Sequence, residues 1–460
     1  MVRAIPAGIS WRLPFLRRHF SRCEMEQHAV RLAMCVLAIV IAPPAMAATL
    51  TVCPSGCGYS SIQSAINAAL AGDTIAIGTG IYAENVVIDK PLTLRRASRG
   101  SHPLLVPAFS SPNSCAGASL CADLSESNIV LVQAHNVMID GLTLDGDNPG
   151  LVSGIAAGGA DLDARNGIIT DHRISVFNSL TVVGTTVRNI YLRGIYASSG
   201  GTFTFAGNTV RNVQADPASI AMFNFGGSGI MADNDVSDAN DAISSNWSRG
   251  VQFLRNTVVR SASGVHTDNA GGGASPADLI EGNTVSRCLP GGYGVWVFVP
   301  YTAPVVKDNV VRECAVGLAV FGQGAPVTPS FSGNNLNGHG ESDSLGVLVS
   351  TDILGFGSRD VTASFSNNVI SHFGTGIYVE QQCELFGFIC DLTKQATAEF
   401  RFNIINANDA GANGLTGTAV DAVNNWWGCS NGPNAPGCDT AIGTVTVTPW
   451  LEKHPNKGNN

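Results

Sequence analysis

The phrase Phe205-Ala206-Gly207-Asn208-Thr209-Val210 decides the fold, because variants of it return along most of the chain. The next two copies are Met231-Ala232-Asp233-Asn234-Asp235-Val236 and Phe253-Leu254-Arg255-Asn256-Thr257-Val258. An apolar residue stands two positions after each central asparagine, and another stands three positions before most of them. Short strands that return every 22 to 35 residues predict a solenoid. The nine asparagines are Asn208, Asn234, Asn256, Asn283, Asn309, Asn334, Asn368, Asn403 and Asn425.

Each repeat predicts three short strands. The first ends just before the asparagine, and the second carries the valine that follows it. The third strand begins at a pair such as Gly194-Ile195 or Gly264-Val265. Asparagine is expected to turn the chain, since it tolerates left-handed dihedrals and its amide can bond the equivalent asparagine in neighbouring coils. Identical columns one coil apart predict an all-β, right-handed parallel β-helix of about a dozen coils.

The two ends of the solenoid carry residues suited to closing it. Ser60-Ser61-Ile62-Gln63 resembles a capping box, and the apolar residues from Ile62 to Leu70 fall on one helical face, which predicts an N-terminal capping helix. Trp426-Trp427 and Trp450 are expected to close the last coil. No Pro- or Ser-rich linker divides the repeats, which predicts one domain over residues 48–451 and a polar tail at 452–460.

Residues 1–47 are interpreted as a signal peptide preceded by an N-terminal extension. Arg31 precedes the apolar run from Leu32 to Ala42, and Ala45-Met46-Ala47 forms an A-x-A cleavage site. The run is too short for a membrane span, so no membrane insertion is expected. The chain is therefore predicted to be secreted or periplasmic, with Met1 or Met25 as its start.

The charge of the mature chain excludes some partners. Residues 1–47 hold six arginines and two glutamates, so the 26 basic and 35 acidic residues fall to 20 and 33, a net charge of −13. This balance argues against nucleic acid or an anionic membrane as partner, and a monomer is expected.

Ten of the 12 cysteines remain in the mature chain, an even number that is typical of an oxidising compartment. Sequence proximity suggests four loop staples. The fifth pair joins equivalent positions of successive repeats, whose strands lie about 4.8 Å apart, within reach of a disulfide. Free thiols or a metal site are the alternative. The suggested pairs are Cys53–Cys57, Cys115–Cys121, Cys288–Cys314, Cys383–Cys390 and Cys429–Cys438.

The chain resembles the secreted right-handed β-helix proteins of the pectin-lyase-like superfamily over nearly all of residues 49–451. The opening phrases Tyr59-Ser60-Ser61-Ile62-Gln63 and Gly80-Ile81-Tyr82-Ala83-Glu84 are similar to the entry coil of that superfamily. Asn424-Asn425-Trp426-Trp427-Gly428 resembles the terminal cap of many bacterial members. The resemblance implies the fold but little chemistry, because lyases, hydrolases, esterases, epimerases and non-catalytic proteins share it.

The catalytic signatures of the best-known branches are missing. The Gly-Arg-Pro-Trp of pectinesterases and the Asp-Pro-His-Asp of alginate epimerases are absent. Gly338-His339-Gly340 lacks the aspartate partners that accompany it in polygalacturonases, and Gly141 replaces the histidine of a pectate-lyase phrase.

Strand alternation predicts which residues of the third strands face outward. The residue after each inward Ile or Val forms one outward column, and the residue two further on forms a second. An irregular coil is expected to add Ala221 and Phe223. The first column is Tyr196, Ser244, His266, Trp296, Ala319, Leu348 and Tyr378, and the second is Ser198, Asn246, Asp268, Phe298, Phe321, Ser350 and Glu380.

The two columns predict a glycan groove. Sugar rings would stack on the aromatic residues, and polar residues would bind hydroxyls. In a uronan lyase, Arg249 or Arg193 would neutralise the carboxylate, His266 would remove the α-proton and Tyr301 would protonate the leaving oxygen. Alternatively, loops cover this face and its aromatic residues form a secondary core. The predicted substrate-binding residues are Tyr196, Asn246, Trp247, Asp268, Trp296 and Phe298.

Two acidic stretches, Asp145-Gly146-Asp147-Asn148 and Asp233-Asn234-Asp235 with Asp238 and Asp241, offer oxygen ligands that Ca²⁺ accepts. Asx-rich turns between strands explain them equally well, since no EF-hand spacing is present. No other cofactor is expected.

The function predicted first is binding of an extracellular or cell-wall polysaccharide, with cleavage by a polysaccharide lyase or glycoside hydrolase mechanism left open. The rival is a non-catalytic surface or adhesion scaffold. A helper in copper-site maturation is a third possibility, which the lack of a Met- or His-rich tract disfavours.

Overall fold

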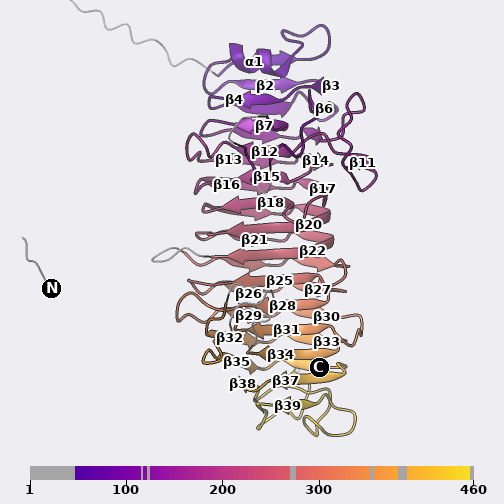
Figure 1. The fold of residues 1–460 in the computed structure, drawn as a ribbon, viewed down its shortest axis with the longest axis vertical. Coiled ribbons are helices and arrows are strands. Elements are labelled where there is room, and N and C mark those ends of the chain that lie inside the picture. Colours follow the sequence, from indigo (N-terminus) through magenta and orange to yellow (C-terminus); the bar gives the residue numbers. More distant parts are fainter. Residues whose placement is uncertain are drawn as a thin grey trace, which may run out of the picture. The chain divides into compact units, whose positions relative to one another are not determined.

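The computed structural model describes residues 47–115, 118–121, 125–269, 276–352, 357–381 and 391–455. Most of the predicted leader and tail, and the predicted pair Cys383–Cys390, lie outside the described residues. From Ala47 onward the chain forms one compact unit. Its strands stack in chain order, as the colours in Figure 1 show.

One strand of each coil belongs to a parallel sheet of 15 strands, which we call the first stack. The count exceeds a dozen because the coils before Asn208 lack the asparagine phrase. The strands are β1 (Thr49–Val52), β2 (Thr74–Ile77), β5 (Thr93–Arg96), β8 (Met138–Asp140), β13 (Leu180–Val183), β16 (Thr202–Ala206), β19 (Ser228–Ala232), β21 (Gln252–Leu254), β23 (Leu279–Glu281), β26 (Val305–Lys307), β29 (Ser330–Ser332), β32 (Val361–Ser366), β35 (Ala396–Arg401), β38 (Thr418–Asp421) and β40 (Val445–Thr446).

The other strands form two further stacks, which β20 and β22 join into one sheet of 23 strands because each runs through both. The second stack contains β3 (Gly80–Ala83), β6 (Pro103–Val106), β9 (Thr143–Asp145), β14 (Thr186–Arg188), β17 (Thr209–Val213), the first halves of β20 (Asp235–Asn246) and β22 (Thr257–Asp268), β24 (Thr284–Ser286), β27 (Val310–Arg312), β30 (Asn335–Asn337), β33 (Val369–Ser371) and β36 (Ile404–Asn406). The third stack contains β4 (Val86–Ile88), β7 (Asn128–Val132), β12 (Asn166–Thr170), β15 (Arg193–Ala197), β18 (Ile220–Phe225), the second halves of β20 and β22, β25 (Tyr293–Phe298), β28 (Val316–Val320), β31 (Leu345–Ser350), β34 (Thr375–Glu380), β37 (Ala410–Gly414) and β39 (Ala441–Gly443). A small antiparallel pair, β10 (Ala156–Ala157) and β11 (Ala160–Asp161), lies outside the stacks.

The nine asparagines form a continuous buried ladder between the first and second stacks. The amide oxygen of Asn208 accepts from the N–H of Thr185, and each later one accepts from the preceding asparagine, as Asn256 does from the backbone N–H of Asn234 at 3.1 Å and from its Nδ2 at 2.8 Å. Each Nδ2 also donates to a carbonyl of the coil before it, as Asn256 does to Met231 at 2.9 Å. The ladder thus satisfies polar groups that the turn would otherwise bury unpaired.

The left-handed residue of this turn is not the asparagine, as the sequence predicted, but the residue before it. Asp233, Arg255 and Asp308 have φ values of 57°, 52° and 57°, and Gly207 and Gly282 occupy the same position. The asparagine is needed for its side-chain amide, because that amide forms hydrogen bonds with the coil before it and with the coil after it.

The interior is apolar, and helix α1 (Ile62–Ala68) contributes Ile62, Ala65 and Ile66 to it. Ser61 accepts from the N–H of Ser64, while the N–H groups of Ile62 and Gln63 donate to Glu84. The carboxylate that accepts from the N-terminal N–H groups of the helix therefore belongs to Glu84, which follows the helix in the sequence. It ends at Ala68, so the expectation of a longer helical face was wrong, and Leu70 is exposed.

Candidate functional site

The outer face of the third stack, which we call the outer face, carries three columns of side chains rather than the two predicted. The registers place Tyr196, Phe223, Ser244, His266 and Trp296 side by side in successive coils. Asn246, Asp268 and Phe298 align in the second predicted column. Ala221 instead lies in the interior, so its predicted place on this face was wrong: Phe223, two residues further on, occupies the first column.

The third column holds the residue two positions before the inward Ile or Val. It contains Asp241, Ser263 and Tyr293 in register. The glycine is required because a methyl group on Gly264 would collide with the carbonyl oxygen of Gly294 in the next coil. Counting strict alternation from the inward Ile or Val misses this column, because the register skips the residue between the two positions.

The three columns converge on His266, which is 6% exposed. Its Nδ1 lies 3.5 Å from Asp241 Oδ2 and 3.4 Å from Ser263 Oγ. Its Nε2 lies 3.3 Å from Asn246 Oδ1. The indole of Trp296 stacks on the imidazole at 4.0 Å between centroids, and its N–H donates to Ser263. We call these five residues the His266 site.

This arrangement suits proton transfer. A carboxylate beside Nδ1 favours the tautomer in which Nδ1 carries the proton, which leaves Nε2 to exchange a proton. The carboxylate beside Nδ1 is that of Asp241, which the missed column supplies. Asp268 lies in register with Asn246 and is also buried.

Several buried polar atoms around the His266 site have no hydrogen-bond partner among the described residues. They include Arg193 Nε, Asp241 Oδ1 and Ser244 Oγ. Burial lowers the pKa of Arg193 to about 10 and raises that of Tyr196 to about 12. Because buried polar groups are nearly always paired, such atoms mark a place that accommodates a further polar group.

The other predicted catalytic residues are not placed with His266. Arg249 is exposed and lines a depression on the first stack with Phe203 and Ile230. The hydroxyl of Tyr301 accepts from Arg359 at 3.2 Å, and its ring lies against Gly324. Neither residue contacts the five residues of the His266 site.

The predicted substrate-binding residues divide by exposure. Trp247 is 54% exposed, while Trp296, Phe298 and Asn246 are half-buried. Tyr196 is buried, stacked on Phe223 at 4.7 Å in an apolar cluster with Leu120. Trp296 and Phe298 border a second cluster, formed by Val316, Ala319, Phe321 and Leu348.

A buried acid lies at the C-terminal end of the same face. Burial raises the pKa of the Glu380 carboxyl and nearby Asp352 raises it further, although a hydrogen bond with Ser350 opposes both effects. Tyr378 lies in register with Leu348 and completes the predicted column.

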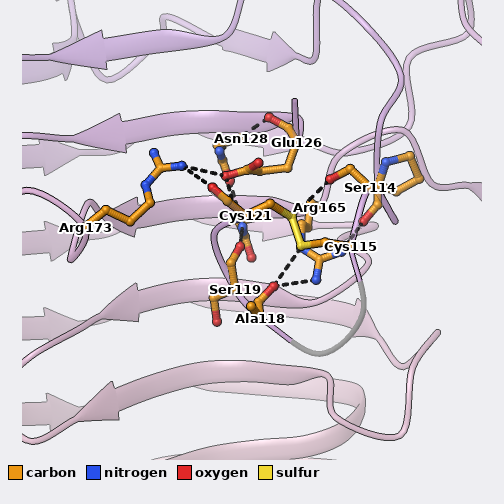
Figure 2. Close-up of a disulfide and its surroundings, with 11 residues drawn as sticks. Ser114, Cys115, Ala118, Ser119, Cys121, Glu126, Asn128, Arg165 and Arg173 are labelled. Carbon is orange, nitrogen blue, oxygen red and sulfur yellow. Dashed lines mark hydrogen bonds and ion pairs between the residues drawn. A yellow bond between two sulfur atoms is a disulfide. The ribbon is translucent and has the colours of Figure 1, made fainter. Parts of the chain in front are cut away.

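The N-terminal end of the outer face is covered by the loop before β7, described at 107–115, 118–121 and 125–127. Figure 2 shows the disulfide Cys115–Cys121 in this loop and buried Arg165 beneath it. Arg165 donates to the carbonyl of Ala118 at 3.1 Å and to that of Pro112 at 3.0 Å. The loop is thereby tied to β12 and covers Tyr196 and Phe223.

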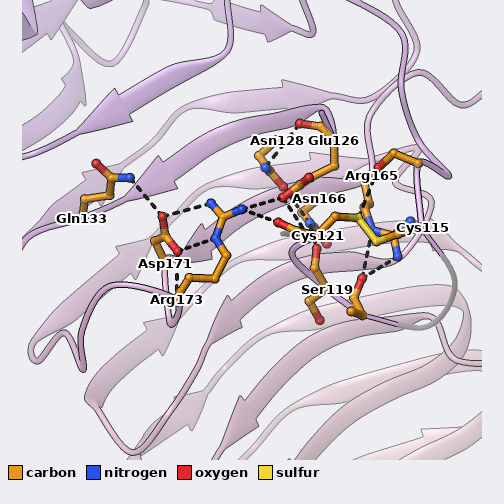
Figure 3. Close-up of polar contacts among 12 residues, drawn as sticks. Cys115, Ser119, Cys121, Glu126, Asn128, Gln133, Arg165, Asn166, Asp171 and Arg173 are labelled. Carbon is orange, nitrogen blue, oxygen red and sulfur yellow. Dashed lines mark hydrogen bonds and ion pairs between the residues drawn. A yellow bond between two sulfur atoms is a disulfide. The ribbon is translucent and has the colours of Figure 1, made fainter. Parts of the chain in front are cut away.

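A chain of polar contacts continues beside this disulfide (Figure 3). Arg173 pairs with Asp171 through two contacts of 2.9 and 3.0 Å, and reaches Glu126 at 3.3 Å. Gln133 donates to Asp171 at 3.0 Å. Burial raises the pKa of Asp171, but these hydrogen bonds outweigh burial and hold it below its usual value. Burial also lowers the pKa of His172.

Four predicted disulfides are present in the structure. They are Cys53–Cys57, Cys115–Cys121, Cys288–Cys314 and Cys429–Cys438, of which Cys288–Cys314 joins neighbouring coils. These four pairs fit an oxidising compartment.

The acidic stretches have cationic or amide partners. Asp145 contacts Arg188 at 2.6 Å, and Asp233 contacts Arg255 at 2.8 Å. Within the described ranges, no three His, Cys, Asp or Glu residues are grouped to hold a metal ion. In the same part of the chain, no helix is long and apolar enough to cross a membrane.

A family model described as a right-handed β-helix region matches residues 194–358. The A-module of mannuronan C-5 epimerase AlgE6 from Azotobacter vinelandii is similar in structure, with a TM-score of 0.53 and 15% identity over 84% of this chain and 94% of that one. The chain therefore has the fold of a right-handed parallel β-helix. Polygalacturonase from Erwinia carotovora ssp. carotovora is 12% identical over 89% of this β-helix and 99% of that chain, with a TM-score of 0.42. Pectin methylesterase from Aspergillus niger is 16% identical over 65% and 86%, with a TM-score of 0.35. No curated protein matches the sequence.

Proposed function

We propose that this protein is secreted and binds an extracellular polysaccharide along its outer face, and that the His266 site transfers a proton on it. The observation that carries the proposal is the convergence of His266, Asp241 and Asn246 beside a half-buried Trp296. Successive coils lie about 4.8 Å apart, so one chain of sugars would meet several coils.

In this proposal the aromatic residues pack on the sugar rings and the polar residues form hydrogen bonds with the sugar hydroxyl groups. Trp296 and Phe298 present half-buried rings on which the apolar faces of sugars can pack. Asn246 offers its amide to hydroxyl groups, and Ser244 Oγ and Arg193 Nε, which have no hydrogen-bond partner among the described residues, lie in the neighbouring columns. The AlgE6 module, whose name states that it acts on mannuronan, shares the fold and is consistent with such a ligand.

For a uronan, the chemistry would be β-elimination. His266 Nε2 would take the proton α to the carboxylate, the electron pair would form the C=C bond, and the glycosidic C–O bond would break as its oxygen gains a proton from water. Asp241 would stabilise the imidazolium. Arg193 is a better placed cation than Arg249, because it lies two coils from Asp241 in the same column.

The rival is a binding or structural scaffold without turnover. The observation that favours it is that two apolar clusters, one around Tyr196 and one around Phe321, already occupy part of the outer face. A hydrolase would leave reducing ends without a C=C bond, so the two enzyme classes are distinguishable.

The test uses the chain from Ala48 with a panel of uronic-acid and neutral polysaccharides, with and without Ca²⁺. Affinity electrophoresis reports binding, and ultraviolet absorbance together with reducing ends reports turnover. Trp296→Ala should weaken binding about tenfold, whereas Phe402→Ala, at an exposed aromatic residue, should not change it.

His266→Ala should abolish turnover, while the exposed His339→Ala serves as its control. Turnover that survives His266→Ala would contradict the catalytic role. Binding without turnover across the panel would favour the scaffold, and no binding to any polymer would overturn the proposal.

A further inference from the structure

The first strand of the β-helix begins beside the bond at which the leader is predicted to be cleaved. That bond joins Ala47 to Ala48, both of which are exposed, and β1 starts at Thr49. The compact unit of the chain also begins at Ala47. Cleavage there would therefore place a new N-terminus directly against the folded solenoid.

The backbone nitrogen of Ala48 has a fixed position. Its N–H donates to Asp73 Oδ1 at 2.7 Å, and the Ala48 carbonyl accepts from the N–H of Thr74 at 2.8 Å. The next residue, Thr49, pairs with Thr74 in the parallel register of β1 and β2. None of these contacts involves a residue before Ala48, so removal of the leader leaves all of them in place.

Asp73 is a buried acid whose described side-chain partners are neutral. It lies in the turn before β2 and is 6% exposed. Its Oδ2 accepts from the N–H of Leu70 at 2.8 Å. Among the described residues, no Lys, Arg or His side chain forms an ion pair with it. A buried carboxylate is costly without an opposite charge, so a cation at the Ala48 nitrogen would stabilise this arrangement.

Hydrolysis of the Ala47–Ala48 bond supplies that cation. Water adds to the carbonyl carbon of Ala47, the C–N bond breaks, Ala47 leaves as a carboxylate and the Ala48 nitrogen becomes an ammonium group. An α-amino group is mostly protonated at pH 7, because its ordinary pKa is about 8. The neutral donor to Asp73 thus becomes a charged one, and charge-assisted hydrogen bonds are roughly twice as strong as neutral ones.

We propose that removal of the leader creates an α-ammonium group on Ala48 that forms an ion pair with Asp73 and fixes the first strand of the β-helix. In the precursor the same nitrogen belongs to a neutral peptide bond, which provides the hydrogen bond without the charge. The inference rests on the secretion that the proposed function includes, but not on a polysaccharide or on the His266 site.

The ion pair would act where the solenoid is weakest. β1 is the terminal strand of the first stack and pairs within that stack only with β2, which lies beside α1 in Figure 1. Terminal segments open more easily than the interior of a fold. Asp73 joins the start of β1, through Ala48, to the segment that follows α1, through Leu70. Processing would therefore stabilise this end of the molecule only after the leader has gone.

The first experiment identifies the N-terminus. The full-length chain is exported from a bacterial host, and mass spectrometry of the intact exported protein gives its first residue, which we expect to be Ala48. A different first residue would overturn this inference and leave polysaccharide binding untouched. A chain that keeps its leader and stays in the cell would contradict the proposed secretion as well.

The second experiment measures the ion pair by hydrogen exchange of the β1 amides at pH 7. The chain that begins at Ala48 should exchange about tenfold more slowly than a chain that begins at Ala45, whose ammonium group lies three residues away. It should also exchange about tenfold more slowly than an α-N-acetylated chain from Ala48, in which only the charge is lost. Equal exchange of the three chains would overturn the inference.

Asp73→Asn separates the charge from the length of the terminus. In this variant the three chains should exchange alike, whereas Asp89→Asn, at an exposed residue, should keep the tenfold differences. Differences that persist in Asp73→Asn would assign the effect to something other than the ion pair. The acetylated wild-type chain decides the matter if Asp73→Asn does not fold, because it removes the charge and leaves Asp73 in place.

Discussion

The asparagine ladder and the outer face are built from the same coils, yet they differ in what repeats. In the ladder, one residue type makes the same contacts nine times, and every member is at most 1% exposed. On the outer face, equivalent positions hold Tyr196, Ser244, His266 and Trp296 in turn. Positions that hold the same residue type in every coil are therefore those that hold the coils together. Positions whose residue type changes from coil to coil are not constrained in this way and can form a binding site.

Breaking the ladder should have the largest effect. Asn256→Ala removes two bonds donated by Asn234 and leaves the Asn234 N–H and the Met231 carbonyl without their partner. Each buried group left unpaired costs about 1–3 kcal/mol, so the free energy of unfolding should fall by about 3–4 kcal/mol. Urea denaturation measures this. Asn335→Ala, exposed and next to the ladder, should be nearly neutral; a similar loss there would refute the ladder's special role.

The glycine column beneath the outer face should tolerate change almost as poorly. Gly264→Ala drives a methyl group into the Gly294 carbonyl and into Val285. Overpacking of this kind costs about 2–3 kcal/mol, to be measured as a lower urea midpoint. Gly100→Ala is the control, because nothing lies within 4 Å of its added methyl group. Equal stability of the two variants would contradict the close approach of neighbouring coils.

Acid should weaken the covered N-terminal end of the outer face through Asp171. Its pKa in the folded protein is lowered, so its stabilising effect is complete above the ordinary aspartate pKa of about 3.9 and is lost as the pH falls through the folded value. Asp171→Asn should therefore destabilise by about 1–2 kcal/mol at pH 7 and progressively less below pH 4. Urea midpoints across that range test this, with exposed Asp89→Asn as control. A difference from wild type that does not shrink with falling pH would argue against the ion pair.

The smallest effect on stability is expected when an exposed ion pair between neighbouring coils is removed. Arg260 contacts Asp238 at 2.6 and 2.8 Å, but about half of its side chain is exposed. Exposed pairs contribute little, so Arg260→Ala should change stability by less than about 0.5 kcal/mol. A loss near that of Asn256→Ala would show that repetition alone, without burial, stabilises the coils.

Much of the fold could be predicted from the repeats, since a column that recurs at coil spacing must stack on itself. The turn was placed one residue off, because a sequence shows which residue is conserved but not which one carries the left-handed backbone. His266 was found because it occupies a regular outward position. Asp241 was missed because the register skips Ala242, so strict alternation from Ile243 does not place Asp241 on the outer face.

The sequence by itself determined the solenoid, the parallel stacking and the pairing of Cys288 with Cys314 as a prediction the structure confirms, because these depend on residues that repeat. Tertiary structure alone decided which polar side chains meet: Asp241 beside His266, Arg359 beside Tyr301, and Arg173 between Asp171 and Glu126. Those contacts join residues in different coils and loops, and their geometry follows from how the backbone bends and which loop covers the face.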